Sequence, residues 1–189
     1  CPVIIDNMMN LELLFWATKE SKDSTYYNIA VSHARTTMKN HFRPDYTCWH
    51  VVSYNNDGTV ERKQTHQGKN DDSSWSRGQA WAVYGYTSCY RETNDTTFLN
   101  FAVNIADMIM ERVKTDDAIP YWDYDAPVTE ETPRDASAAA VYGARAAYGV
   151  ILVTTKNGKV GKTNVSYNGR FSFGDTTTST DFETRGYYS

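Results

Sequence analysis

The stretch Lys19-Glu-Ser-Lys-Asp-Ser-Thr-Tyr-Tyr-Asn-Ile-Ala-Val31 decides the fold, because the chain contains a second copy of it. The copy is Arg91-Glu-Thr-Asn-Asp-Thr-Thr-Phe-Leu-Asn-Phe-Ala-Val103, with Asp95 in the place of Asp23. Each copy reads as the end of one helix, a polar turn, an Asp cap and the start of a second helix. A carboxylate suits the cap because it accepts the free N–H groups of the first helical turn.

The helix predicted after each cap has one apolar side. After Asp95 the stripe at helical spacing consists of Phe98, Phe101, Ala102, Ile105, Met108, Ile109 and Val113. After Asp23 its counterpart consists of Tyr26, Ile29, Ala30, His33, Ala34, Thr37 and Met38. The place of His33 on this stripe favours a hydrogen-bonded core residue over a metal or substrate ligand.

The helices predicted before the two turns, over residues 7–18 and 79–90, are apolar on nearly every side and therefore expected to be buried. Buried inner helices that alternate with amphipathic outer ones are typical of an α/α barrel or solenoid. A third inner helix is predicted from Arg134, because Pro-Arg-Asp-Ala-Ser-Ala-Ala parallels Ser-Arg-Gly-Gln-Ala-Trp-Ala. The predicted fold is mainly α, with two helical hairpins and the start of a third.

The pattern changes at Asp135-Ala-Ser-Ala-Ala-Ala140. A helix of small residues is predicted over 136–147, followed by a β-branched strand over 149–155 and a turn at 156–159. Apolar and polar residues then alternate over 165–173, as in a half-buried strand or a lipid-facing barrel strand. The chain therefore ends in a small predicted α-β-β segment.

Composition excludes several functional classes. The net charge of the 189 residues is −4, so no basic field indicates nucleic acid binding. No apolar run reaches the ~18–20 residues of a membrane-spanning helix. The three cysteines (Cys1, Cys48 and Cys89) have no metal-ligand spacing, and neither a metal nor a cofactor is expected. Fourteen tyrosines and five tryptophans suit a sugar-binding cleft, and equally a core or an interface.

The repeat indicates where a site would lie. Asp6, Gly78 and Asp135 fall at equivalent points near the starts of the inner helices, which share one rim of a barrel. The connection over 43–75 is much longer than a typical loop of ~4–6 residues, which favours a binding role. Within it, a β-hairpin is predicted around Asn55-Asn-Asp-Gly58.

Asp6 is the candidate catalytic residue. It is a lone carboxyl between Ile5 and an apolar helix, and poor solvation favours the neutral form, which a general acid requires. The alternative is that Asp6 is only a helix N-cap.

Four further residues are candidates for substrate binding. Arg77 and Trp81 share a helical face and could hold a carboxylate and stack on a sugar ring; a buried salt bridge and a core indole fit as well. His50 and Gln67 could donate to ligand hydroxyls, or be ordinary polar loop residues. The pair Asp71-Asp72 fits either a cap or a site.

Three stretches resemble glycoside hydrolase family 88, the unsaturated glucuronyl hydrolases. In order along the chain they are Val3-Ile-Ile-Asp-Asn-Met-Met-Asn-Leu-Glu-Leu-Leu14, Asp71-Asp-Ser-Ser-Trp-Ser-Arg-Gly-Gln-Ala-Trp81, and Tyr121-Trp-Asp-Tyr-Asp-Ala-Pro127 with Pro133-Arg-Asp-Ala-Ser-Ala-Ala139. The resemblance covers about residues 1–140. It implies a partial (α/α)6 barrel and a substrate that is an unsaturated uronic-acid oligosaccharide left by a polysaccharide lyase.

The resemblance also implies roles for the candidate residues. The acid/base aspartate of the family falls on Asp6, and binding positions fall on His50, Gln67, Arg77 and Trp81. The implied reaction is hydration: Asp6 protonates the vinyl ether double bond, water adds across it, and the hemiketal collapses to release the sugar. A second aspartate of the family and the first and last helical hairpins have no counterpart here, so the chain is expected to be an inactive fragment.

The end of the chain resembles another family. Asp135-Ala-Ser-Ala-Ala-Ala-Val-Tyr-Gly-Ala-Arg-Ala-Ala-Tyr-Gly-Val-Ile-Leu-Val-Thr-Thr-Lys156, continuing to Val165-Ser-Tyr-Asn-Gly169, is similar to the plug end and first barrel strand of SusC/RagA-type TonB-dependent outer-membrane transporters. The predicted organisation is a partial hydrolase barrel over 1–134, a shared junction over 135–140 and a transporter-like fragment over 141–189. We interpret the chain as a joined sequence.

Two other functions stay open from the sequence. One is a piece of an outer-membrane glycan transporter, and the other is a non-catalytic helical-repeat scaffold that binds glycan. The resemblances imply a periplasmic or cytoplasmic place for the hydrolase part and an outer-membrane place for the parent of the tail.

Overall fold

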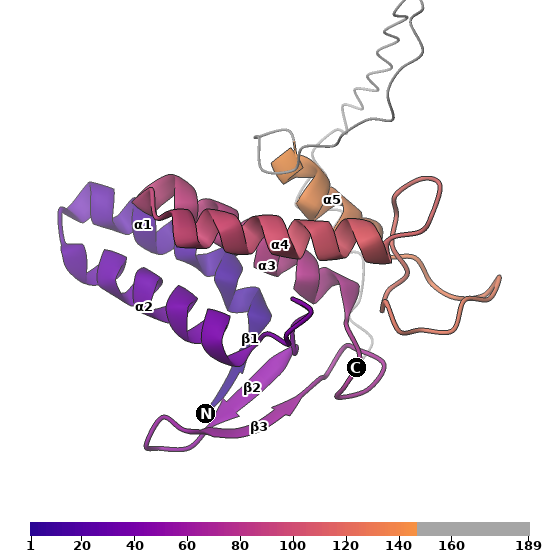
Figure 1. Cartoon of the computed structure of the whole chain (residues 1–189). Helices are drawn as coiled ribbons and strands as arrows, with labels where there is room; N and C mark the ends of the chain where they lie inside the picture. Colours follow the sequence, from indigo (N-terminus) through magenta and orange to yellow (C-terminus); the bar gives the residue numbers. More distant parts are fainter. Residues whose placement is uncertain (147–189) are drawn as a thin grey trace, which may run out of the picture. The chain divides into compact units, whose positions relative to one another are not determined.

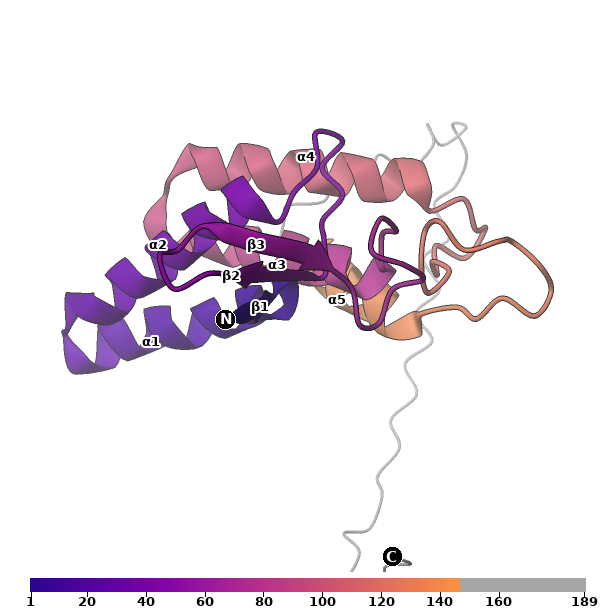
Figure 2. The same ribbon diagram turned by 90° about the horizontal axis from the view of Figure 1, so that it is seen from below.

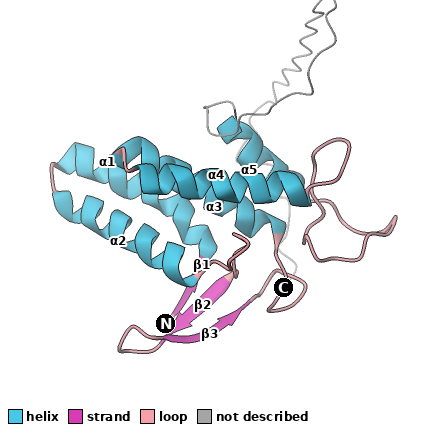
Figure 3. Ribbon diagram, in the orientation of Figure 1, coloured by secondary structure: helices cyan, strands magenta, loops and turns pink. Residues whose placement is uncertain are grey.

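The computed structural model describes residues 1–146, with side chains described as far as residue 143. The strands predicted over 149–155 and 165–173 lie outside the described residues. Five α-helices, one 3-10 helix and three strands make up the described part, which is mainly helical (Figure 3). No helix within residues 1–146 is long and apolar enough to cross a membrane.

The helices form two antiparallel hairpins and begin a third (Figure 1). In chain order they are the 3-10 helix η1 (Ile5–Asn10), α1 (Leu11–Ser21), α2 (Ser24–Asn40), α3 (Ser76–Thr93), α4 (Thr96–Arg112) and α5 (Ala136–Ala146). The helix predicted over 7–18 is thus a 3-10 turn followed by an α-helix. The expected repeat of inner and outer helices is confirmed.

Both predicted aspartate caps are present. Asp23 accepts a hydrogen bond from the Thr25 amide at the start of α2, and Asp95 accepts one from the Thr97 amide at the start of α4. Lys22 and Asn94 end the preceding helices in the left-handed conformation. The polar turns therefore stop one helix and cap the next in both copies of the repeat.

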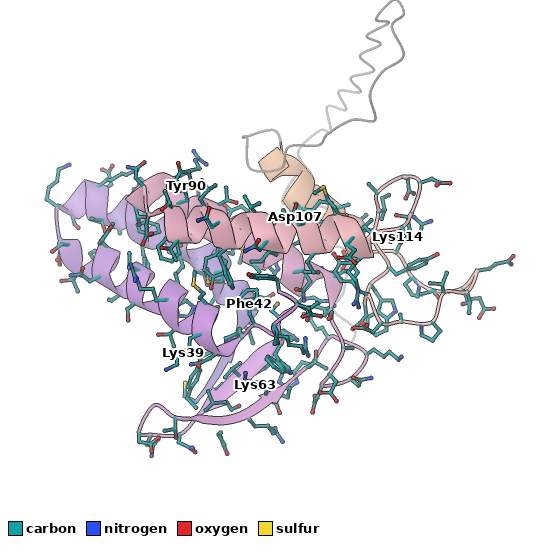
Figure 4. The ribbon with its side chains drawn as sticks, in the orientation of Figure 1. Lys39, Phe42, Lys63, Tyr90, Asp107 and Lys114 are labelled. Atoms are coloured by element: carbon teal, nitrogen blue, oxygen red, sulfur yellow. The ribbon has the colours of Figure 1, made fainter. Side chains whose placement is uncertain are left out.

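Helix α3 is central and contacts α4, α5, η1 and α1. Small residues allow the close approach, since a Cβ on Gly85 would lie only 2.5 Å from the Met8 Cβ. Tyr86 on α3 is fully buried, and its hydroxyl donates to the Ala34 carbonyl of α2. Phe42, labelled in Figure 4, packs edge-on against Tyr86 and against Phe101 of α4.

Helix α1 differs from the prediction that it is buried on every side. Leu13 is 63% exposed and Trp16 is 57% exposed, whereas Leu11 and Phe15 face the core. On α2 the predicted stripe is also partly exposed, because Ala30, Ala34 and Thr37 are buried but Tyr26 and Ile29 are not. His33 is only partly buried and its Nε2 has no hydrogen-bond partner in the described part of the chain, so the predicted hydrogen bond is missing there.

The three strands form one antiparallel sheet in the order β1-β2-β3. They are β1 (Pro2–Ile4), β2 (Val51–Tyr54) and β3 (Val60–Gln64). The hairpin β2-β3 turns at Gly58, which has a φ of 83°, and confirms the hairpin predicted around Asn55-Asn-Asp-Gly58. Figure 2, viewed from below, shows β2 and β3 in front of α3.

A buried amide ties the sheet to α3. The Gln79 side chain accepts a hydrogen bond from the Cys48 amide at 3.0 Å and donates to the Cys48 carbonyl at 3.3 Å. Gln79 is fully buried, so these bonds satisfy backbone groups that water cannot reach. The segment that leads into β2 is thereby fixed against the first turns of α3.

Candidate functional site

Asp6 is held at the junction between the sheet and η1. Ile4 pairs with Val51 of β2, and the Ile5 amide donates to the His50 carbonyl at 2.9 Å. Asp6 is the second residue of η1, whose N-cap is Ile4 without a side-chain hydrogen bond. The alternative that Asp6 is an N-cap is therefore wrong.

The Asp6 carboxylate faces His50. The distance from Asp6 Oδ2 to His50 Nε2 is 3.6 Å, slightly longer than a hydrogen bond. The Asp6 side chain is 22% exposed, yet its Oδ2 is buried and has no hydrogen-bond partner among the described residues. A buried acceptor oxygen without a partner is uncommon in folded proteins and is a feature of functional sites.

His50 is buried, and its other ring nitrogen is occupied. The backbone amides of His66 and Gln67 lie 3.1 Å and 3.3 Å from Nδ1. Burial lowers the pKa of His50 more than the nearby Asp6 carboxylate raises it, so the ring is neutral near pH 7. The site thus pairs a carboxylate with a neutral imidazole.

Gln67 contributes to this arrangement through its backbone, because its side chain is exposed. Its loop is supported by Asp71, whose carboxylate accepts a hydrogen bond from the Thr65 amide at 2.9 Å. The Asp71-Asp72 pair does not cap α3, whose N-cap is Trp75. Asp71 supports the loop, and Asp72 is exposed.

Arg77 lies at the start of α3 and forms an ion pair. Its guanidinium contacts Asp135 Oδ2 at 3.0 Å, and Asp135 also caps α5 by accepting from the Ala138 amide. The guanidinium carbon lies 5.5 Å from the ring centre of Trp75. Trp75 in turn lies 4.6 Å from the His50 ring, so it links Arg77 to the Asp6–His50 pair.

Trp81 is half-buried one turn further along α3. Its indole packs edge-on against Tyr84, with ring centres 6.0 Å apart. Within residues 1–143 no hydrogen bond or ion pair joins Trp81 or Arg77 to Asp6. The structure therefore brings Asp6, His50 and the Gln67 backbone together and connects Arg77 to them through an aromatic ring.

Sequence reasoning missed two residues of this site. Trp75 packs against His50 with its ring tilted by 39°, and Asp123 is a fully buried carboxylate that binds the loop carrying Gln67. A signal for Asp123 existed in the acidic and aromatic stretch 121–125, but its partners lie some fifty residues away. In the described range no group of three or more His, Cys, Asp or Glu side chains is arranged to hold a metal ion.

Comparison with known proteins confirms both resemblances. An unsaturated glucuronyl hydrolase of Formosa agariphila is 55% identical over 142 residues, which are 74% of this chain and 36% of that protein. The crystal structure of an unsaturated glucuronyl hydrolase specific for heparin superposes with a TM-score of 0.72 at 51% identity, covering 74% of this chain and 38% of the other. The described part is therefore a partial α/α barrel of that kind.

The second resemblance covers a short segment. The TonB-dependent receptor SusC of Bacteroides thetaiotaomicron is 59% identical over 44 residues, which are 23% of this chain and 4% of the receptor. No protein-family model matches the chain. The chain spans little more than a third of the hydrolase that it matches and a small fraction of the receptor.

Proposed function

We propose that residues 1–134 are part of an unsaturated glucuronyl hydrolase and that Asp6 is its general acid and base. The observation that carries the proposal is the Asp6 carboxylate, with a buried, unpartnered Oδ2 that lies 3.6 Å from His50 Nε2. The 55% identity to a hydrolase of this kind over most of the chain supports the same reaction.

The chemistry follows from the substrate. A Δ4,5-unsaturated uronic acid is a vinyl ether, which is protonated at C4 to give a cation stabilised by the ring oxygen at C5. Asp6 in its protonated form supplies that proton, and the carboxylate that remains takes one back from the water that adds to C5. The hemiketal then opens and releases the sugar, so no second carboxylate is needed as a nucleophile.

The binding roles extend the proposal. His50 and Gln67 would contact substrate hydroxyls at the edge of the long loop. Arg77 would attract the uronate carboxylate, since a guanidinium can form paired hydrogen bonds with a carboxylate. Trp81 would stack on a sugar ring. The substrate class is an unsaturated uronic-acid oligosaccharide.

The test is an assay of the complete parent protein of residues 1–134, because this chain spans 36% of its relative. Loss of the ultraviolet absorbance of an unsaturated disaccharide reports the reaction. Asp6→Asn is expected to lower the rate about 10²- to 10⁴-fold, the usual contribution of a general acid–base group. Asp107→Asn is the control, since Asp107 is exposed on α4 (Figure 4).

An Asp6→Asn protein that keeps the parent's rate would overturn the assignment. A parent that binds the disaccharide without consuming it would instead favour the non-catalytic scaffold.

A second proposal concerns the organisation of the chain. We propose that residues 141–189 derive from a TonB-dependent transporter and that 135–140 is where two sequences join, which the 44-residue match to SusC supports. Amplifying the source DNA across codons 130–150 tests this. A single intact reading frame would exclude an assembly error, whereas separate products would support it.

A further inference from the structure

Asp123 is a carboxylate with no exposed surface, and it lies between two loops. Its Oδ2 accepts hydrogen bonds from the Lys69 amide at 2.9 Å and from the Ser73 hydroxyl at 2.6 Å. Its Oδ1 accepts one from the Asp125 amide at 2.9 Å. A buried carboxylate needs such donors in place of water, so the position of Asp123 and the course of the 65–75 loop determine each other.

The loop passes directly against this carboxylate. At Gly68 an added Cβ would lie 3.1 Å from Asp123 Oδ2 and 2.8 Å from Thr65 Oγ1, so only a hydrogen fits there without a shift. The Gly68 amide donates to Thr65 Oγ1 at 2.8 Å. These contacts fix the turn that precedes Lys69.

The same turn presents two amides to His50. The His66 and Gln67 N–H groups both point to Nδ1 and need its lone pair as acceptor. Nδ1 therefore carries no hydrogen, and the single proton of the neutral ring lies on Nε2. Nε2 is the atom that faces Asp6 Oδ2 at 3.6 Å.

We propose that Asp123 is a positioning residue: it holds the 65–75 loop so that two backbone amides keep His50 in the Nε2–H tautomer that faces Asp6. An N–H in this place can donate to the carboxylate or to a water or hydroxyl that enters beside it. The other tautomer would turn a lone pair toward the carboxylate oxygen and repel it. The catalytic consequence rests on the proposed function, but the tautomer itself does not.

The experiment is ¹⁵N NMR of histidine side chains in the 189-residue chain, with the His50 signals assigned by their loss in His50→Gln. In the unsubstituted protein Nδ1 of His50 is expected to have the shift of an unprotonated nitrogen and Nε2 that of a protonated one. In Asp123→Asn the side-chain NH₂ group would face a group that is itself a donor, either a backbone amide or the Ser73 hydroxyl. A hydrogen bond to the loops would therefore be lost. Both His50 signals are then expected to move toward the average of two exchanging tautomers.

Asp117→Asn is the matched control, because Asp117 is exposed and its contacts are to Ile119 and Arg134. It should leave the His50 signals in place. If Asp123→Asn loses its folded amide spectrum, Ser73→Ala decides, since it removes one hydrogen bond to Asp123 and should shift the signals in the same direction by less.

A protonated Nδ1 in the unsubstituted chain, or unchanged His50 signals in a folded Asp123→Asn or Ser73→Ala protein, would overturn the inference. A parent protein without hydrolase activity would overturn the proposed function and leave this result standing.

Discussion

At the scale of the residue, His41 shows how burial couples this fold to pH. It is fully buried at the end of α2, and its Nδ1 donates to the Trp49 carbonyl at 3.2 Å. Burial lowers the pKa of His41 from 6.5 to about 4, although the hydrogen bond to Trp49 acts in the opposite direction. Between these values the unfolded chain binds more protons than the folded one. The stability is therefore complete above about pH 6.5 and is lost as the pH falls toward 4.

We predict that lowering the pH from 7 to 5 reduces the free energy of unfolding by about 2 kcal/mol through His41. Urea denaturation at the two pH values measures the difference. His41→Asn removes the titrating group, so its pH dependence should be weaker by that amount even if the variant is less stable overall. His66→Asn, at an exposed position, should keep the slope of the unsubstituted protein. Equal slopes for His41→Asn and the unsubstituted chain would contradict the prediction.

The sequence predicted which residues form the candidate site, but it did not predict all of the contacts that hold them. Asp6 and His50 were chosen for their types and places along the chain, and they lie 3.6 Å apart. The alternative that Asp6 is only a helix N-cap was wrong because the 3-10 helix begins at Ile5, one residue before Asp6. Asp123 was missed because its role depends on how the loop at Lys69 folds back onto it, and residue types do not encode that path.

At the scale of the element, the internal repeat gave the two helical hairpins and their aspartate caps, because capping depends on local sequence. The β2-β3 hairpin followed from its turn for the same reason. Strand β1 was not predicted, since three residues are too short for a pattern and β1 exists only by pairing with β2. Local sequence signals therefore predicted the helical hairpins and the β2-β3 hairpin. They did not predict β1, which forms through pairing with a strand far away in the sequence.

The packing of η1 on α3 gives a prediction at this scale. A Cβ at Gly85 would lie 2.5 Å from Met8 Cβ and 2.9 Å from the Met8 carbonyl oxygen. Since backbone cannot yield as a flexible side chain does, Gly85→Ala should push η1 away from α3. The expected loss in the free energy of unfolding is about 1–3 kcal/mol, the usual cost of overpacking.

Gly143 is the matched control for this substitution. It lies within α5 and an added Cβ would meet no atom of the described residues within 4 Å, so Gly143→Ala should stabilise the helix by about 0.5–1 kcal/mol. Denaturant unfolding of both variants measures the contrast. A Gly85→Ala protein at least as stable as the unsubstituted chain would show that η1 can shift without cost.

At the scale of the whole molecule, the described barrel is partial, and its helices show it. Helix α1 buries Leu11 and Phe15 on one side and exposes Leu13 and Trp16 on the other. On α2, Ile29 is 50% exposed. A closed α/α barrel would bury such side chains against further helices, and in this chain the described residues leave them in contact with water. Large exposed apolar side chains of this kind favour association.

We therefore predict that the 189-residue chain self-associates in a concentration-dependent manner through α1. Sedimentation velocity over a range of concentrations measures it. Leu13→Glu combined with Trp16→Glu should shift the population toward monomer, because two charges replace the apolar surface without touching the buried side of the helix. Val128→Glu is the control, since Val128 is 70% exposed but lies in the loop before α5. A double variant that associates as strongly as the Val128→Glu protein would show that another surface drives association. A chain that stays monomeric at every concentration would show that the exposed apolar side chains of α1 do not drive self-association.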